Sequence, residues 1–574
     1  MNREGMSRPV LSVIGVATAM IVSAALLPAQ ERPDSGGMHH ENEMSHDASP
    51  LLDAPRLGEL TFATSATPPA HAAFIRGMLY LHNFHYPQAA AAFREAQQLD
   101  PGDVMSYWGE AVSYTHPVWN EQDTSAARAV LRRLAATPAE RSAKARTKHE
   151  RTWLATAEAL YDDDVSKARR DTLFSASLAS LRAAYPEDVE AQLFYALSLL
   201  GLNEGDRDVP TYLRAYAIAR RVFRAHPNHP GAAHYVIHAV DDPAHASLGL
   251  DAARAYSRIA PDASHAQHMT SHIFIALGMW DDVIDANVRA QNPPHSQARR
   301  QYGHGVQWLA YALVQEGRYA EAAGWVDSMR AQTDRYSRNA KVGSDAVIES
   351  RSYLVLDRAA YVADTRDWRS PHATLDIDTT GLGVHDLAAN DLALGAAALG
   401  RGERARADSM LARMRTRNAR ARAGAGEGEE SASEIGYARV IERTLGAMVS
   451  HANGKGADAV TMLALAAALD DSLPFAFGPP VEIVSPHELA GEYLLELGRP
   501  NDALREYGLA LGRAPGRTAA LIGLATAQTE LGRRADAQRS YALVAKNLAH
   551  ADSSAIVTSC SRATRSRPIC PRRR

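Results

Sequence analysis

The sequence of 574 residues has only two cysteines, Cys560 and Cys570, and both lie near its end. Their spacing excludes a CxxC metal site or redox pair, and no cysteine nucleophile is available in the body of the chain. A disulfide between them could form in an oxidising compartment, but it would close only a loop of the tail.

Aromatic residues make up 7 % of the chain, and the formal net charge is −4. This charge provides no general attraction for nucleic acid, so no nucleic-acid partner is expected.

The sequence also lacks the signatures of several common enzyme classes. It has no HExxH zinc motif, no G-x-S-x-G elbow and no Walker A loop. These absences leave catalysis without an obvious nucleophile or base.

Only one long apolar run is present, VLSVIGVATAMIVSAALL, and it follows the basic residues Arg3 and Arg8. This pattern predicts a secretory signal peptide over residues 1–29, cleaved near Ala29. No cysteine follows the run, which excludes a lipoprotein anchor. The alternative is an uncleaved anchor, because about 18 apolar residues can just cross a bilayer. We expect a periplasmic or secreted protein with no membrane span after cleavage, or else one held at the membrane by this segment.

Residues 30–69 are rich in Pro, Ser, Gly and Asp and include the stretch MHHENEMSH. Its His and Met side chains are of the type that captures copper or zinc. The composition favours the simpler interpretation, a flexible polar leader.

From residue 70 the pattern becomes helical and repeats at a fixed interval. Apolar and small residues occur at helical spacing, with a break near His85–Pro87 and a stop at Pro101. The positions that carry the repeat are Gly77, Tyr80, Ala89, Phe93, Ala96 and Pro101 in the first copy, Gly491, Gly498, Ala503, Tyr507, Ala510 and Pro515 near the end, and then Gly532, Ala537 and Tyr541. Pro227 and Pro261 show the same interval in the middle of the chain.

These positions resemble the tetratricopeptide repeat (TPR), whose period of about 34 residues matches this interval. The resemblance implies an all-α fold, a TPR-type helical-hairpin solenoid with a concave groove. It covers most of residues 70–548, where Ala89 and Ala503 are expected to lie at helix contacts. We expect TPR-like repeats over 70–419, a Gly/Glu/Ser-rich mobile linker at 420–434, further repeats over 435–548 and a disordered basic tail at 549–574.

Histidines are concentrated in the middle of the chain. Residues 226–272 contain eight of the 23 histidines. His234 and His238 are separated by one helical turn and therefore share one helix face, and His268 and His272 repeat that pair one TPR period later. The segment also resembles a group of exported bacterial TPR proteins with a His-rich centre, a likeness that brings no activity with it.

The TPR resemblance implies where these side chains point, because positions 2, 5 and 9 of the first helix of each repeat line the groove. Repeat starts at Pro230 and Ser264 place both histidine pairs at positions 5 and 9. The remaining groove positions in this frame are His265, His229, His304, Glu488 and Glu492. The last two would make the C-terminal end of the groove acidic.

Two interpretations of the histidines remain open. Imidazoles from adjacent helices can share a transition-metal ion, which predicts zinc or copper bound by His234, His238, His268 and His272, with His265, Asp241 and Asp242 as further ligands or orienting groups. Alternatively, they are structural groove side chains that hydrogen-bond to their neighbours. Under the metal interpretation, changing His238 and His272 to Ala should abolish tight binding and cost little stability, because no core cavity is made in an exposed groove.

The first functional hypothesis is an exported scaffold without catalytic activity that binds a partner protein, peptide or small ligand in its groove, in part through a bound metal. The alternative is a metal-dependent enzyme of the hydrolase type, with a metal-activated water at the histidine wall.

Overall fold

The computed structural model describes residues 55–202, 207–292, 303–339, 342–424, 431–555 and 559. The predicted signal peptide, the first part of the predicted leader, the centre of the predicted linker and both cysteines lie outside these residues.

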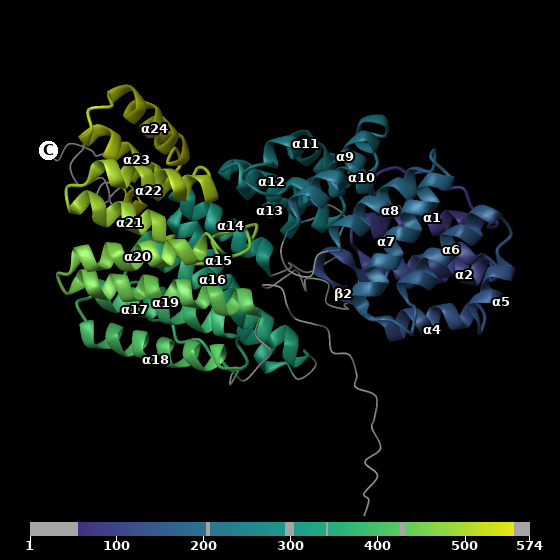
Figure 1. Ribbon diagram of the computed structural model, residues 1–574, viewed down its shortest axis with the longest axis horizontal. Coiled ribbons are helices and arrows are strands. Elements are labelled where there is room, and N and C mark those ends of the chain that lie inside the picture. The colour runs from purple at the N-terminus through teal and green to yellow at the C-terminus, as the bar shows by residue number, and fades with distance from the viewer. Residues whose placement is uncertain are drawn as a thin grey trace, which may run out of the picture. The chain divides into compact units, whose positions relative to one another are not determined.

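The described chain is a succession of helices with one short two-stranded ribbon (Figure 1). The elements are α1 (Pro68–His82), α2 (Tyr86–Leu99), α3 (Val104–Val112), β1 (Thr115–His116), η1 (Pro117–Trp119), β2 (Glu121–Gln122), α4 (Thr124–Leu134), α5 (Pro138–Lys144), α6 (Lys148–Leu160), α7 (Lys167–Ala184), α8 (Val189–Leu200), α9 (Val209–Ala225), α10 (Pro230–Val240), η2 (Ala246–Gly249), α11 (Leu250–Ile259), α12 (Ser264–Ala276), α13 (Trp280–Gln291), α14 (His304–Gln315), α15 (Tyr319–Arg338), α16 (Ser344–Thr365), η3 (Pro371–Thr374), α17 (Val384–Gly400), α18 (Arg404–Arg422), α19 (Ala432–Ala452), α20 (Gly456–Asp470), α21 (Pro486–Glu496), α22 (Pro500–Arg513), α23 (Thr518–Glu530) and α24 (Arg534–Asn547).

The predicted fold class is confirmed: the helices form hairpins of the TPR type. Most helices pack on their neighbours in the chain, as α19, α20, α21 and α22 do in Figure 1. The repeat starts predicted at Pro230 and Ser264 are the first residues of α10 and α12. Tight turns inside several hairpins place a glycine at positive φ, where a side chain would be strained: Gly278, Gly317, Gly402, Gly454, Gly498 and Gly532.

An aromatic side chain wedged between glycines explains why the repeat positions carry those residue types. Phe93 of α2 lies against Gly77 of α1 and Gly109 of α3, where an added Cβ would approach its ring to 2.7 and 2.4 Å. Tyr507 does the same between Gly491 and Gly523 in the C-terminal repeats. Ala89 and Ala503 are fully buried at helix contacts, as expected. Small residues on one helix therefore make room for the aromatic residue of the next.

Residues 55–67 differ from the flexible leader predicted for them. Leu57 and Phe62 are buried, and the amide of Asn83 in the α1–α2 turn donates to the carbonyl of Leu57 at 3.0 Å. Arg56 forms an ion pair with Asp262 at 3.0 Å. Two buried apolar side chains and a long-range ion pair hold this segment against the repeats, a packing that its polar composition does not reveal.

Within the described residues, no helix is both long enough and apolar enough to cross a bilayer.

The buried carboxyl of Asp357 in α16 should make the free energy of unfolding depend on pH. Its side chain is buried, its two oxygens have no hydrogen-bond partner in the described part of the chain, and burial raises the pKa of this carboxyl well above its ordinary value. The folded state therefore holds a proton that the unfolded state releases, so stability falls as pH rises above the unfolded pKa. Replacing Asp357 with Asn should therefore reduce the loss of unfolding free energy as pH rises above the unfolded pKa, by up to about 1.4 kcal/mol per pH unit. Urea titrations at several pH values measure this slope, and Asp345→Asn, exposed on the same helix, should leave it unchanged.

Candidate metal centres

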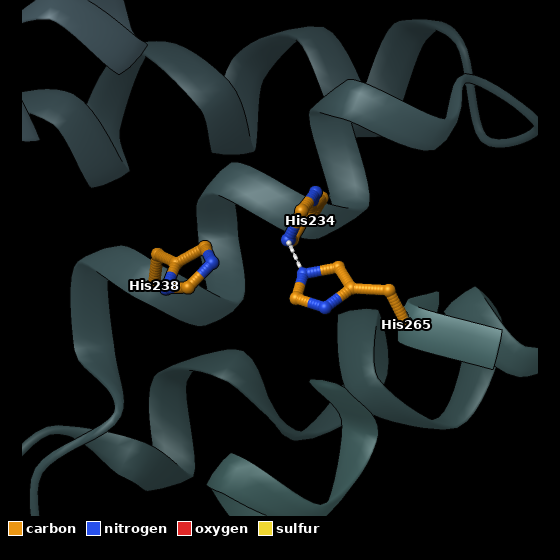
Figure 2. A group of neighbouring side chains, drawn as sticks. All are labelled: His234, His238 and His265. Carbon is orange, nitrogen blue, oxygen red and sulfur yellow. Dashed lines mark hydrogen bonds between the residues drawn. The ribbon is translucent and has the colours of Figure 1, made fainter. Parts of the chain in front are cut away.

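The first histidine cluster joins two successive repeats. His234 and His238 lie one turn apart on α10, and His265 reaches towards them from the first turn of α12 (Figure 2). The Nε2 atoms of His265 and His234 are 3.2 Å apart. One ring nitrogen from each residue lies within 4.8 Å of the others, and all three side chains are buried. We call this group site I.

The second cluster repeats the first one repeat later. His268 and His272 lie on α12, and His304 begins α14. The Nε2 atoms of His304 and His268 are 2.6 Å apart, and again one nitrogen from each residue lies within 4.8 Å of the others. We call this group site II. Each site thus combines positions 5 and 9 of one repeat with the start of the first helix of the next.

This grouping differs from the single four-histidine site that the sequence suggested. His234 and His238 form one group and His268 and His272 another, and the described residues contain no candidate group with all four. The offset of one repeat separates the pairs along the stack, and the histidine of the following helix completes each group. The placement of His265 and His304 decides this arrangement.

Hydrogen bonds on the outer side of the rings set which nitrogen faces each cluster. His234 donates from Nδ1 to the backbone carbonyl of His82 at 2.8 Å. His268 donates from Nδ1 to Oδ1 of Asn287 at 2.6 Å, and the amide of Asn287 donates in turn to the carbonyl of Val283, which fixes its orientation. A neutral imidazole that donates from Nδ1 presents its Nε2 lone pair on the other side. Both sites therefore direct an unprotonated nitrogen inward, the arrangement seen in histidine-bound metal sites.

Asp241 lies between the two sites, at the end of α10. Its Oδ2 is 3.1 Å from Nδ1 of His272 and 3.9 Å from Nδ1 of His238. Burial alone would raise the pKa of Asp241, but the guanidinium of Arg207 and the hydrogen bond from His272 outweigh it and lower that pKa to about 2. Asp241 is therefore a fixed negative charge shared by the two sites.

Asp242, also predicted as a ligand, is placed elsewhere. Its carboxylate accepts from Nδ1 of His245 at 2.8 Å and lies 3.4 Å from Arg207. It belongs to none of the candidate metal groups among the described residues. Its role here is to hold the turn that follows α10.

Aromatic side chains cover both sites, and this changes the expected exposure. The ring of Phe84 lies 4.2 Å from that of His234, while Trp308 and Phe477 lie 4.5 and 5.0 Å from His272, centroid to centroid. The six histidines are 0 to 8 % exposed. The prediction of an open groove wall is wrong for them, because the α1–α2 turn and the loop before α21 pack over the positions that would line it.

Phe84 occupies an unfavourable backbone conformation at this place. Its φ is +56°, in the left-handed region that glycine fills in the turns of several other hairpins. Strain of this kind costs of order 1–3 kcal/mol and persists where the surroundings require it. Its ring also lies 5.7 Å from His238 and 5.5 Å from His265, so Phe84 contacts all three histidines of site I.

His82, Glu190 and His229 form a third buried group. In this group the histidine nitrogens donate protons towards the centre, where a carboxylate accepts them. His229 Nδ1 accepts from the backbone of Ala232, so its Nε2 carries the proton that it donates to Glu190 at 2.8 Å. His82 Nε2 lies 2.7 Å from the other carboxylate oxygen, and its Nδ1 lies 2.9 Å from the hydroxyl of Tyr235. Burial acts to raise the pKa of Glu190, but the two histidines outweigh it and lower that pKa. These contacts describe a satisfied carboxylate rather than a set of converging lone pairs.

Sequence reasoning missed this group. Glu190 carried no signal in the sequence. His229 was predicted to face the groove, but it is buried and donates a hydrogen bond to Glu190. Only the packing of α1 on α10 and of α10 on α8 brings the three together.

The two predicted acidic groove residues are neutralised. Glu488 forms an ion pair with the buried Arg517 at 2.6 Å, and Arg517 also binds Asp364 at 2.5 Å. Glu492 forms an ion pair with Arg366 at 2.5 Å. The acidic end expected from the sequence is therefore paired with arginines, which the repeat frame did not place.

The fold and these sites define a TPR-type helical-repeat protein with a histidine-rich interior. The sequence matches no protein-family model, and no curated protein matches it. Among solved structures it is similar to the human IFIT1 dimer with m7Gppp-AAAA, at 12 % identity over 85 % of this chain and 92 % of that one, with a TM-score of 0.30. Yeast Tom70 is similar at 11 % identity over 86 % and 95 %, with a TM-score of 0.26. At these TM-scores neither likeness carries an argument about function.

Proposed function

We propose that this chain is an exported TPR-type scaffold that carries two transition-metal ions, zinc or copper, one in site I and one in site II. The observation that supports this most strongly is the direction of the ring nitrogens. In both sites a histidine anchored through Nδ1 turns its Nε2 towards the Nε2 of a histidine from the next repeat. The Nε2 lone pair of the anchored histidine therefore either accepts a proton from the facing Nε2 or shares a metal ion with it.

The surroundings of the sites suit a metal with nitrogen ligands. Imidazole binds zinc and copper well, and the groups that orient the rings are a carbonyl, an amide and a carboxylate. Phe84 and Trp308 exclude water, which strengthens electrostatic interactions inside. The same features would tie α10, α12 and α14 together, so metal binding would contribute to folding stability.

As a scaffold, the protein would present its stacked helices to a protein or peptide partner, since repeat arrays offer extended surfaces for binding. Metal in the two sites would then stiffen the central repeats that shape this surface.

A metal-dependent hydrolase is the second candidate. Three protein ligands leave a fourth position for water, as in catalytic zinc sites. Asp241 also lines a small pocket together with Trp280 and Tyr311, from which water would reach the sites. Azide or cyanide binding to the Co²⁺-substituted protein would support this candidate, and an unchanged visible spectrum would favour the scaffold.

Calorimetric titration of the metal-free protein with Zn²⁺ tests the proposal. We expect two ions per chain at pH 7.5 and loss of binding below about pH 6, because histidine ligands must be deprotonated to bind. No binding at pH 7.5 would contradict the proposal and leave the histidines as structural groups.

Export is proposed from the basic and apolar pattern of residues 1–29. N-terminal sequencing of the mature protein should find a start near Gln30, whereas an intact Met1 on a membrane-bound chain would indicate the anchor.

A further inference from the structure

We propose that Asp241 makes the two sites unequal, so that site II binds its ion first and more tightly than site I. This inference depends on the proposed function, because it concerns how the two ions load.

The carboxylate is placed to serve one histidine only. Oδ2 of Asp241 is at hydrogen-bond distance from Nδ1 of His272, at 3.1 Å, but is 3.9 Å from Nδ1 of His238. The bond to His272 places a proton on Nδ1 and increases the basicity of Nε2, the nitrogen that remains available to an ion in site II. An outer carboxylate of this kind raises metal affinity by about 10–100-fold.

Arg207 keeps the carboxylate from serving both histidines. Its guanidinium forms an ion pair with Oδ1 of Asp241 and a 3.4 Å contact with Oδ2 of Asp242. It also stacks over the ring of Tyr212 at 4.4 Å. Because Oδ1 is held by Arg207, the second oxygen remains directed at His272.

The surroundings of Asp241 also favour site II as the first to fill. Asp241 lines the pocket formed with Ile275 and Ala276 of α12 and Tyr311 of α14, the two helices that carry site II. A cation entering there passes Arg513, which also lines the pocket, and meets the carboxylate of Asp241 next to His272. The rings of His238 and His272 are 5.8 Å apart, centroid to centroid, so an ion in site II would repel a second ion in site I.

The test is a stepwise calorimetric titration of the metal-free full chain with Zn²⁺. The wild type should show two steps with affinities at least about tenfold apart. His304→Ala should remove the tighter step, and His265→Ala should remove the weaker one. Neither residue belongs to the group that Asp241 forms with His238 and His272, so these variants assign the steps and leave that group intact.

Asp241→Asn should weaken the tighter step by about 10–100-fold and leave the weaker step within about threefold. The matched control is Asp242→Asn, which also removes a carboxylate facing Arg207 and should leave both steps unchanged. A merely structural role for Asp241 would weaken both steps together.

Two equal steps in the wild type would overturn the inference, as would loss of the tighter step in His265→Ala or an equal effect of Asp241→Asn on both. Each of these results leaves the proposed function standing, because two ions still bind. Absence of any binding would refute the proposed function and this inference with it.

Discussion

A protein that carries both His238→Ala and His272→Ala is expected to lose tight binding of both metal ions. His238 belongs to site I and His272 to site II, so each site keeps only two of its three ligands. The affinity should fall by more than the roughly 10–100-fold that follows from loss of an outer hydrogen-bond partner. Titration calorimetry with Zn²⁺ measures the loss. Unchanged affinity in this variant would show that the metal binds elsewhere.

The same variant should also lose about 2–5 kcal/mol of stability without metal, because two buried rings leave cavities. The sequence alone predicted little cost, on the view that these side chains stand in an open groove. The control is His149→Ala with His451→Ala, whose side chains are 27 and 32 % exposed and lie outside the candidate sites. It should keep both ions.

Replacing Glu190 with alanine is expected to destabilise the protein by about 3–5 kcal/mol, the usual cost of removing one partner from a buried charged group. The carboxylate accepts from both His82 and His229, which are fully or almost fully buried. Because the pKa of Glu190 is lowered in the folded state, the carboxylate stabilises the fold above its unfolded pKa and loses this effect as pH falls through its folded pKa. Urea unfolding at pH 7 measures the loss.

Glu530→Ala provides the control for this experiment, since Glu530 is exposed at the end of α23 and should change stability by no more than about 0.5 kcal/mol. A loss below about 1 kcal/mol in Glu190→Ala would show that the two histidines find other partners, and would contradict the hydrogen-bond assignment.

The repeat frame could be predicted from the sequence because TPR packing repeats the same residue types at a fixed period. The starts at Pro230 and Ser264 and the buried Ala89 and Ala503 all follow from that frame. The same arithmetic placed both histidine pairs on equivalent helix faces.

The burial of the sites could not be predicted in this way. Phe84 covers site I from the turn of the first hairpin, and Phe477 covers site II from the loop between α20 and α21, far along the chain. A periodic frame describes contacts between neighbouring repeats, but these contacts join distant ones. The contact of Glu190 with His82 and the ion pair of Glu492 with Arg366 escaped prediction for the same reason.

X-ray absorption spectroscopy of the zinc-loaded protein tests the central claim most directly. Two ions bound by the two histidine clusters should give a spectrum dominated by nitrogen at about 2.0–2.1 Å, with the outer-shell scattering of about three imidazole rings per ion. A first shell without imidazole scattering would contradict the account, because it would place the metal on carboxylates or water and away from His234, His238, His265, His268, His272 and His304.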